Sequence, residues 1–174
     1  MKCTNRTIIV ILSLLLAATP CLASFDSGLK AYKKKDFSRA MKDFKADGGK
    51  NSCYNIGIMY YKGEGVKQDR REAVQWFRKA ADLGDVNAQF TMGMLYDKGE
   101  DLALDQGEAY RWYRKAAEQG HRQAQFNIGY MYTMGEGVKK DPKEAVIWLK
   151  KAAKQGHPEA KKILGVMGEK DGSI

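Results

Sequence analysis

The chain has 174 residues, of which 44% are hydrophobic and 29% are charged, with three prolines and three cysteines. This composition excludes a disordered polyelectrolyte and a small disulfide-stapled domain, and the length allows about one domain with a buried core. The 30 Lys and Arg residues outnumber the 21 Asp and Glu residues, which gives a formal net charge of +9.

The first 23 residues have the three parts of an export signal. Two basic residues are followed by an apolar run over residues 8–18, and small residues precede Ser24. The apolar run is shorter than the about 20 residues that a membrane-spanning helix needs. We therefore predict a signal peptide over residues 1–23, cleavage between Ala23 and Ser24, and no stable membrane insertion. The protein is expected to be exported, either periplasmic or secreted.

Cleavage at this point would leave one cysteine, Cys53. It would also leave 28 basic and 21 acidic residues, a net charge of +7. An exported chain with a single cysteine forms no internal disulfide, so packing must stabilise it. We interpret Cys53 as a small apolar core residue rather than a reactive thiol.

Residues 24–51 are the first predicted folded unit. Leu29 and Tyr32 lie at helical spacing, and Ala40 and Phe44 do the same after Asp36. We predict a short helix hairpin that caps the N-terminal end of the fold.

A period of 36 residues follows, in segments 52–87, 88–123 and 124–159. Twelve of the 36 positions are identical in all three copies. A fourth copy begins at Ala160 and is incomplete, so residues 160–174 are predicted to form a truncated repeat, with a C-terminal capping helix and a tail.

Each copy is predicted to contain two helices. The first spans roughly Ser52 to Lys62 in the first copy, and the second carries one apolar stripe, formed by Ala73, Trp76, Phe77, Ala80 and Ala81. Gly57 inside the first helix predicts a close approach of the second, with the Trp above it. One helix pair cannot bury its apolar face alone, so the copies must stack. The predicted fold class is all-α, an α/α superhelical solenoid of helix hairpins.

The ends of the second helices carry recognisable signals. Asp69 and Glu72 predict an N-terminal capping box, in which the Asp accepts from a free amide and the Glu reaches back. Gly84 and its equivalents predict a left-handed turn at the C-terminus.

The third copy resembles the SEL-one-like repeat, a variant of the tetratricopeptide repeat. The resemblance rests on Gly129, Tyr132, the run Gly135-Glu136-Gly137-Val138, Asp141, Ala145, Trp148, Ala152, Ala153 and Gly156. It covers residues 52–157 and implies an adaptor that binds another protein. The second copy departs from the pattern, because Asp101 replaces the loop glycine. We expect the fold to survive this change, since Asp tolerates a positive φ better than most residues, and the conformation of this loop is left open.

The chain contains none of the common catalytic or phosphate-binding motifs. His121 and His157 lie one period apart and are interpreted as exposed turn residues rather than metal ligands. Glu64 and its equivalents Glu100 and Glu136 are interpreted as acceptors for loop amides. We therefore predict no enzyme, no metal and no cofactor.

The first helices have a second apolar side, which lines the concave groove in tetratricopeptide-type superhelices. The predicted partner-binding residues are Tyr54, Ile58, Tyr61, Lys62, Phe90, Met94, Asp97, Phe126, Tyr130, Thr133 and Met134. The alternative is that some of these residues, Tyr54, Phe90 and Phe126 above all, only pack between adjacent helices. Positions that differ between copies are the better recognition candidates, because a partner's sequence is not periodic.

The predicted function is a non-enzymatic adaptor of the bacterial envelope that binds a peptide or helix of another protein. Paired basic residues, such as Arg114 and Lys115, recur every 36 residues and predict a basic stripe that would suit an acidic partner. Export argues against nucleic acid as the partner. Two alternatives stay open: an enzyme that binds or hydrolyses β-lactams, as implied by cysteine-rich relatives with a cysteine pair in each repeat, and a secreted host-directed effector.

Overall fold

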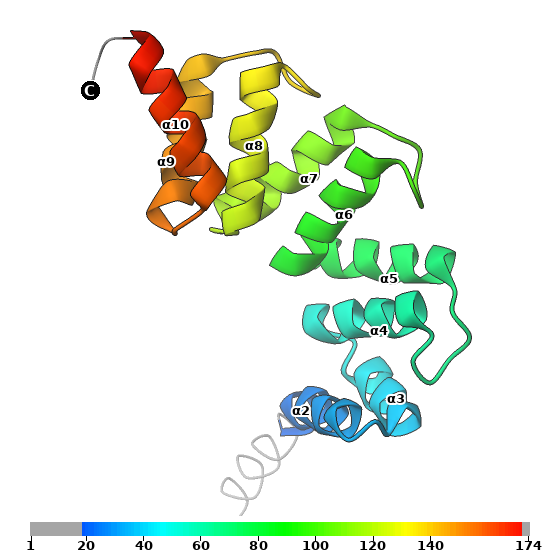
Figure 1. Cartoon of the computed structure of the whole chain (residues 1–174). Coiled ribbons are helices and arrows are strands. Elements are labelled where there is room, and N and C mark those ends of the chain that lie inside the picture. The colour runs from blue at the N-terminus through cyan, green and yellow to red at the C-terminus, as the bar shows by residue number, and fades with distance from the viewer. Residues whose placement is uncertain (1–18, 172–174) are drawn as a thin grey trace, which may run out of the picture.

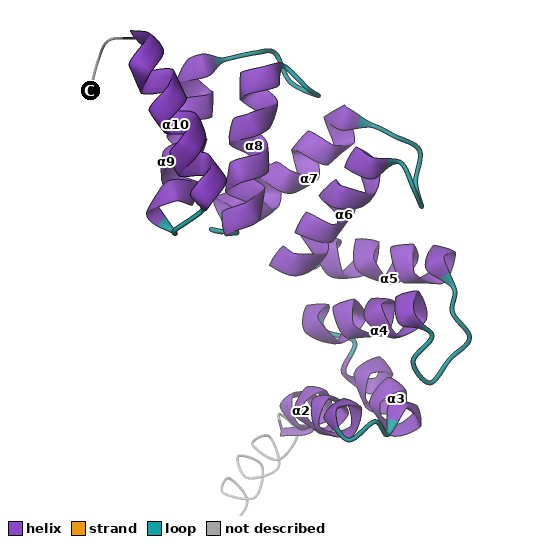
Figure 2. Ribbon diagram, in the orientation of Figure 1, coloured by secondary structure: helices purple, strands orange, loops and turns teal. Residues whose placement is uncertain are grey.

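The computed structural model describes residues 19–171. In this range the chain forms nine α-helices and no strand (Figure 2). The helices are α2 (Thr19–Lys33), α3 (Phe37–Asp47), α4 (Lys50–Lys62), α5 (Arg70–Asp82), α6 (Val86–Lys98), α7 (Gln106–Glu118), α8 (Arg122–Met134), α9 (Pro142–Lys154) and α10 (Pro158–Asp171). The predicted all-α fold is confirmed. Residues 1–18, most of the predicted signal peptide, lie outside the described range, and the cleavage point stays a prediction.

The helices stack as consecutive hairpins into a curved solenoid (Figure 1). Each helix packs on the helices before and after it, and the two helices of a hairpin share the larger contact. The long loops within the repeats lie along the outer edge of the curve, and the short turns between the repeats lie along its inner edge (Figure 1). The helices α2 and α10 lie at opposite ends.

The second helices of the repeats begin at aspartates whose side chains act as N-caps. The carboxylate of Asp69 accepts from the backbone amide of Glu72 at 3.0 Å, as predicted. The other half of the predicted capping box is wrong, because the Asp69 amide donates to the carbonyl of Tyr60 in α4 at 3.0 Å. The carboxylate of Glu72 accepts from the indole N–H of Trp76 instead. The backbone amide of the N-cap residue Asp69 therefore ties α5 to α4, the two helices of the repeat.

The glycine in each first helix accommodates a side chain from the second helix, and that side chain is not the predicted Trp. A Cβ added at Gly93 would lie 2.4 Å from the ring of Tyr113, which follows Trp112. The equivalent neighbours are Phe77 over Gly57 and Leu149 over Gly129. Successive helical residues point about 100° apart, so only one of the two adjacent bulky residues can face its own first helix.

The tryptophans pack on the preceding repeat. Trp148 belongs to the same buried cluster as Ala109, Tyr113 and Ala116 of α7, and Trp112 is buried in a cluster with Phe77 of α5. These contacts join one repeat to the next, as a solenoid requires. The prediction that the tryptophans are core residues is confirmed for Trp112 and Trp148, while Trp76 is half-buried.

The loop of the second repeat differs from the other two at Asp101. Among the described non-glycine residues, Lys35 alone has a positive φ, so Asp101 does not take the left-handed conformation that Gly65 and Gly137 have. The Asp101 carboxylate accepts from the guanidinium of Arg70, at the start of α5, at 3.3 Å. The predicted left-handed turns at Gly84, Gly120 and Gly156 are confirmed.

Candidate partner-binding surface

Three of the predicted binding residues are half-buried aromatics that pack within the scaffold. The ring of Tyr54 lies 5.6 Å from that of Phe77. The ring of Phe90 stacks on His121 at 4.4 Å, and the ring of Phe126 stacks on His157 at 4.2 Å. These rings therefore join each first helix to its own second helix or to the start of the next repeat.

Four more predicted residues have intramolecular contacts. Ile58 and Met94 are half-buried against the core clusters. Asp97 accepts from the hydroxyl of the buried Tyr113 at 3.2 Å, and the hydroxyl of Thr133 donates to the backbone carbonyl four residues earlier. A partner could touch these residues only through the part of each side chain that remains exposed.

The remaining four predicted residues are exposed. Tyr61 lies near the Arg70 guanidinium, 5.2 Å from its ring centre, and the Lys62 ammonium lies 3.9 Å from a carboxylate oxygen of Glu64. The other two, Tyr130 and Met134, are one turn apart on α8 and are 38% and 53% exposed.

Val166 has the position in α10 that Tyr130 has in α8, and it is 50% exposed. We call Tyr130, Met134 and Val166 the α8 patch.

Sequence reasoning missed a polar row beside these apolar residues. Asn55, Thr91 and Asn127 occupy one position of the repeat and lie one turn before Ile58, Met94 and Tyr130, respectively. Asn55 and Thr91 donate to carbonyls of their own helices, which leaves their oxygen atoms as acceptors. The 36-residue period contains this signal, because a polar residue recurs at this position in all three copies.

The two histidines are N-caps of first helices and are not exposed turn residues. His121 is half-buried, and His157 is only 5% exposed. Nδ1 of His121 accepts from the Ala124 amide at 3.2 Å, and Nδ1 of His157 lies 3.4 Å from the Ala160 amide. The prediction of exposure is wrong because the same residues stack on aromatic rings of the preceding repeat.

This arrangement predicts a pH-dependent cap at His121. Burial, and next the charge of Arg122, lower the pKa of His121 from its usual 6.5, so the folded state favours the neutral ring. Below pH 6.5 the unfolded chain binds the proton more readily, and stability falls until the folded-state pKa is passed. Protonated Nδ1 is a donor and can no longer accept from the Ala124 amide.

We expect His121→Asp to remove this acid-dependent loss. Asp85 caps α6 at the equivalent position, where its carboxylate accepts from the Ala88 amide at 2.7 Å. Between pH 7.5 and 5.5, urea unfolding should show a smaller fall in the free energy of unfolding for the variant than for the wild type. Equal slopes in the two proteins would contradict the assignment.

Glu64 of the first long loop acts differently from the prediction, while the prediction for Glu100 and Glu136 stays a prediction. Glu64 accepts a hydrogen bond from the hydroxyl of Tyr32 in α2, so it joins the first repeat to the N-terminal hairpin rather than bonding loop amides. Burial, and next the bond to Glu64, raise the pKa of Tyr32 to about 12.

Many residues of the predicted basic stripe have partners inside the molecule. The ammonium groups of Lys115 and Lys151 lie 4.0 and 3.8 Å from the ring centres of Trp112 and Trp148. Arg114 donates to Glu118 at 2.9 Å. Cation–π and ion-pair contacts thus account for much of the stripe without a partner.

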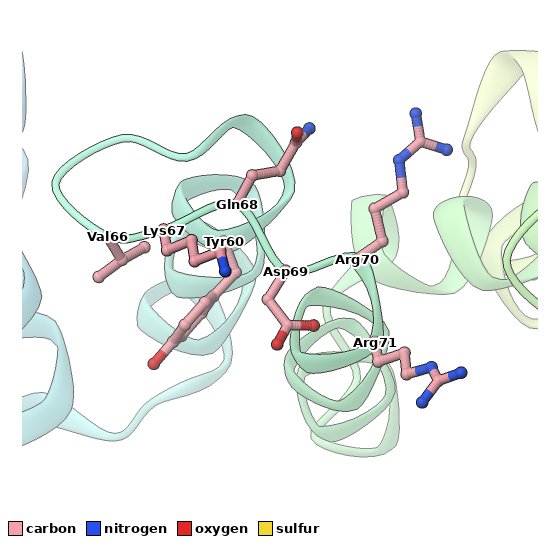
Figure 3. A pocket seen from close by; sticks show the side chains of 7 residues that line it. All are labelled: Tyr60, Val66, Lys67, Gln68, Asp69, Arg70 and Arg71. Carbon is pink, nitrogen blue, oxygen red and sulfur yellow. The ribbon is translucent and has the colours of Figure 1, made fainter.

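A shallow hollow beside the first long loop is lined by Tyr60, Val66, Lys67, Gln68, Asp69, Arg70 and Arg71 (Figure 3). The side chains of Arg70 and Arg71 extend in different directions from the start of α5 (Figure 3). The lining residues therefore do not converge on one point, as the polar groups of a small-molecule site do.

The described residues hold no metal-binding cluster, and Cys53 is not a reactive thiol. Within residues 19–171, no group of three or more His, Cys, Asp or Glu side chains could hold a metal ion. Cys53 is fully buried, as predicted, and burial raises the pKa of its thiol, which leaves it unreactive. None of the helices in this part of the chain is long and apolar enough to span a bilayer.

Comparison with known proteins gives several relatives with the same repeats. A Sel1 repeat protein from Oxalobacter formigenes superposes with a TM-score of 0.78 at 36% identity, covering 86% of this chain and 63% of that one. The protein c5321, described as a protective antigen of uropathogenic Escherichia coli with an SLR fold, superposes with a TM-score of 0.76 at 33% identity. That match covers 84% of this chain and 33% of c5321.

A curated relative matches a shorter stretch. The Helicobacter pylori protein HcpC, whose name carries a β-lactamase designation, is 48% identical over 44 residues, 24% of this chain and 15% of HcpC. The chain thus spans less than two thirds of the length of each of these relatives.

The model of the Sel1 repeat matches three consecutive segments, residues 50–85, 86–121 and 122–157. Each segment begins at or next to the start of a first helix and contains the glycine that accommodates the second. With three matched repeats covering more than half of its length, this chain belongs to the Sel1 repeat family.

Proposed function

We propose that this protein is a non-enzymatic adaptor of the bacterial envelope that holds a peptide or helix of another protein against its first-helix layer. Sel1 repeat proteins are typically protein–protein interaction scaffolds. The observation that carries the proposal is the α8 patch, where Tyr130 and Met134 are exposed on a helix whose other large apolar residues are covered. Exposed aromatic and Met side chains suit contact with another protein.

The variation between copies supports the same surface. The positions of Tyr130 and Met134 hold Ile58 and Lys62 in α4, and Met94 and Lys98 in α6. A scaffold role would require similar residues in every copy, whereas a partner segment would contact each copy differently. A segment that extends from the α8 patch along the layer would meet two lysines, which favours an acidic sequence there.

The envelope location rests on the sequence of the first 23 residues, which has the parts of an export signal. A secreted effector role is compatible with the same signal.

The second candidate, a β-lactam-binding or β-lactam-hydrolysing enzyme, is favoured by the short match to HcpC. The proposal of a non-enzymatic protein is supported by the typical behaviour of the family and by the burial of Cys53. Nitrocefin hydrolysis by the purified chain, lost on substitution of a surface residue, would contradict it.

A peptide-selection experiment tests the adaptor proposal. Peptides selected from a random phage-displayed library on the purified chain are synthesised with a fluorophore, and their affinity is measured by anisotropy. We expect the double variant Tyr130→Ala, Met134→Ala to weaken binding at least about tenfold, since central apolar anchors dominate such contacts.

The matched control replaces two apolar residues of similar exposure elsewhere. Leu104 lies in the second long loop, and Ile147 lies on α9; both are exposed. Leu104→Ala, Ile147→Ala should leave the affinity unchanged. A selected peptide that binds the α8 patch variant as tightly as the wild type, or that loses affinity only in the control, contradicts the proposal.

A further inference from the structure

In the part of the chain that the structure describes, the last helix, α10, is a first helix on which no second helix packs. Gly165 in α10 has the repeat position of Gly57, Gly93 and Gly129. A Cβ added at any of those three would lie 2.4–2.7 Å from a bulky side chain of the second helix, whereas a Cβ at Gly165 would meet nothing within 4 Å. The space above Gly165, which we call the notch, is therefore open within the described residues.

The residues around the notch are less buried than their counterparts. Leu164 is half-buried, whereas Ile56, Met92 and Ile128 at its repeat position are fully buried. Ala153 of α9 is half-buried, whereas Ala81 and Ala117 are buried. We call Ala153, Leu164, Gly165 and Met167 the end face. Its apolar surface corresponds to the surface that a second helix covers in every preceding hairpin.

One position of the first helices, held by Gln89, Gln125 and Lys161, indicates the charge of the segment that covers the end face. Gln89 of α6 accepts from the amide of Gln119, at the end of α7, at 2.7 Å. Gln125 of α8 accepts from the amide of Gln155, at the end of α9, at 2.8 Å. The corresponding residue of α10 is Lys161, which has three donors and no acceptor. A covering helix that ended in Gln could still offer its oxygen, but a carboxylate would form a charge-assisted bond.

The surrounding charges point the same way. Lys150, Lys154 and Lys162 are exposed on α9 and α10, and none of them has a carboxylate within 4.0 Å among the ion pairs of the described residues. Glu159, by contrast, lies 3.2 Å from the His157 ring. Among the described side chains, exposed basic residues therefore outnumber exposed acidic residues on α9 and α10, the two helices that carry the end face.

From these observations we propose that the end face binds an amphipathic helix of a partner protein, which completes the fourth repeat. The helix places a bulky apolar residue over Gly165, as Leu149 lies over Gly129, and an acidic residue of its last turn against Lys161. This site shares no residue with the α8 patch, although Val166 of that patch lies on the same helix, and it does not depend on Tyr130 or Met134.

The probe is a synthetic peptide with the sequence of residues 141–157 and the change Gln155→Glu, because α9 has the apolar pattern that the notch requires. It is titrated into the ¹⁵N-labelled full chain, and amide shifts are followed by NMR. We expect saturable shifts at Ala153, Gly165 and Met167. The same peptide with Trp148→Ala and Leu149→Ala should produce none.

Two variants of the full chain locate the contact. Gly165→Leu should fill the notch without disturbing the fold, because nothing lies within 4 Å of the Cβ position. The leucine side chain would occupy the space that the bulky residue of the peptide needs, so the affinity for the peptide should fall at least about tenfold. Lys161→Glu should likewise weaken it, and a peptide with Gln155→Lys should restore the affinity. The double variant of the α8 patch should bind the peptide normally.

Three outcomes would overturn the proposal. The first is an absence of saturable shifts in the wild type, and the second is equal affinity for the wild type and Gly165→Leu. The third is a wild type that sediments as a dimer which Gly165→Leu dissociates, because the end face would then be covered by a second copy of this chain.

Discussion

Trp148→Ala is expected to lower the free energy of unfolding by about 3–5 kcal/mol, the usual cost of truncating a buried Trp. Trp148 is buried in the cluster that joins α9 to Ala109, Tyr113 and Ala116 of α7. Its removal leaves a cavity between the second and third repeats, and the Lys151 ammonium loses the ring over which it lies. Denaturant unfolding followed by circular dichroism measures the loss.

The matched control is Trp76→Ala at the equivalent position of the first repeat. Trp76 is only half-buried, so its truncation should cost less. Hydrogen exchange adds a spatial test, because repeats in a solenoid are coupled mainly to their neighbours. Exchange in Trp148→Ala should increase most in α7 to α10. A loss equal to that of Trp76→Ala, or uniform acceleration along the chain, would show that Trp148 does not join these repeats.

Gly93→Ala is expected to destabilise the protein by about 1–3 kcal/mol, although alanine is the better helix former. The new methyl group would lie 2.4 Å from Cδ1 of Tyr113. That ring is fully buried and its hydroxyl donates to Asp97, so it cannot move aside without breaking other contacts. The two helices of the second repeat must therefore separate.

Gly165→Ala makes the same chemical change in open space. The helix propensity of alanine should raise the free energy of unfolding by up to about 1 kcal/mol, since nothing lies within 4 Å of the new group. Thermal unfolding of both variants, compared with the wild type, measures the contrast. Shifts of the same sign in the two variants would contradict the difference between a closed and an open notch.

The order of the helices and their limits followed from local signals. The apolar stripe of the second helix, Asp69 at its start and Gly84 after its end are all short-range features, and the structure confirms each of them. Burial of Cys53 was also predictable, because its neighbours in the helix repeat the core pattern.

The partners of individual side chains were less predictable. The glycine of the first helix was expected under the Trp and lies under the next residue, because the rotation of the second helix about its axis depends on the stacked repeat. His121 and His157 were expected in solvent. The amides that they cap are only three residues later and were a local signal, but the aromatic rings on which they stack, Phe90 and Phe126, lie in the preceding first helices. The binding residues divide in the same way: Tyr130 and Met134 are exposed, and Phe90 and Phe126 are engaged.

The amino-acid sequence by itself determined that this protein is a stack of helix pairs, because a 36-residue repetition of caps, stripes and glycines depends only on neighbouring residues. Tertiary structure alone decided which side chains the stack covers and which it leaves open, Gly165 among them. Those assignments depend on how one hairpin is rotated against the next, and contacts between residues more than thirty positions apart set that rotation.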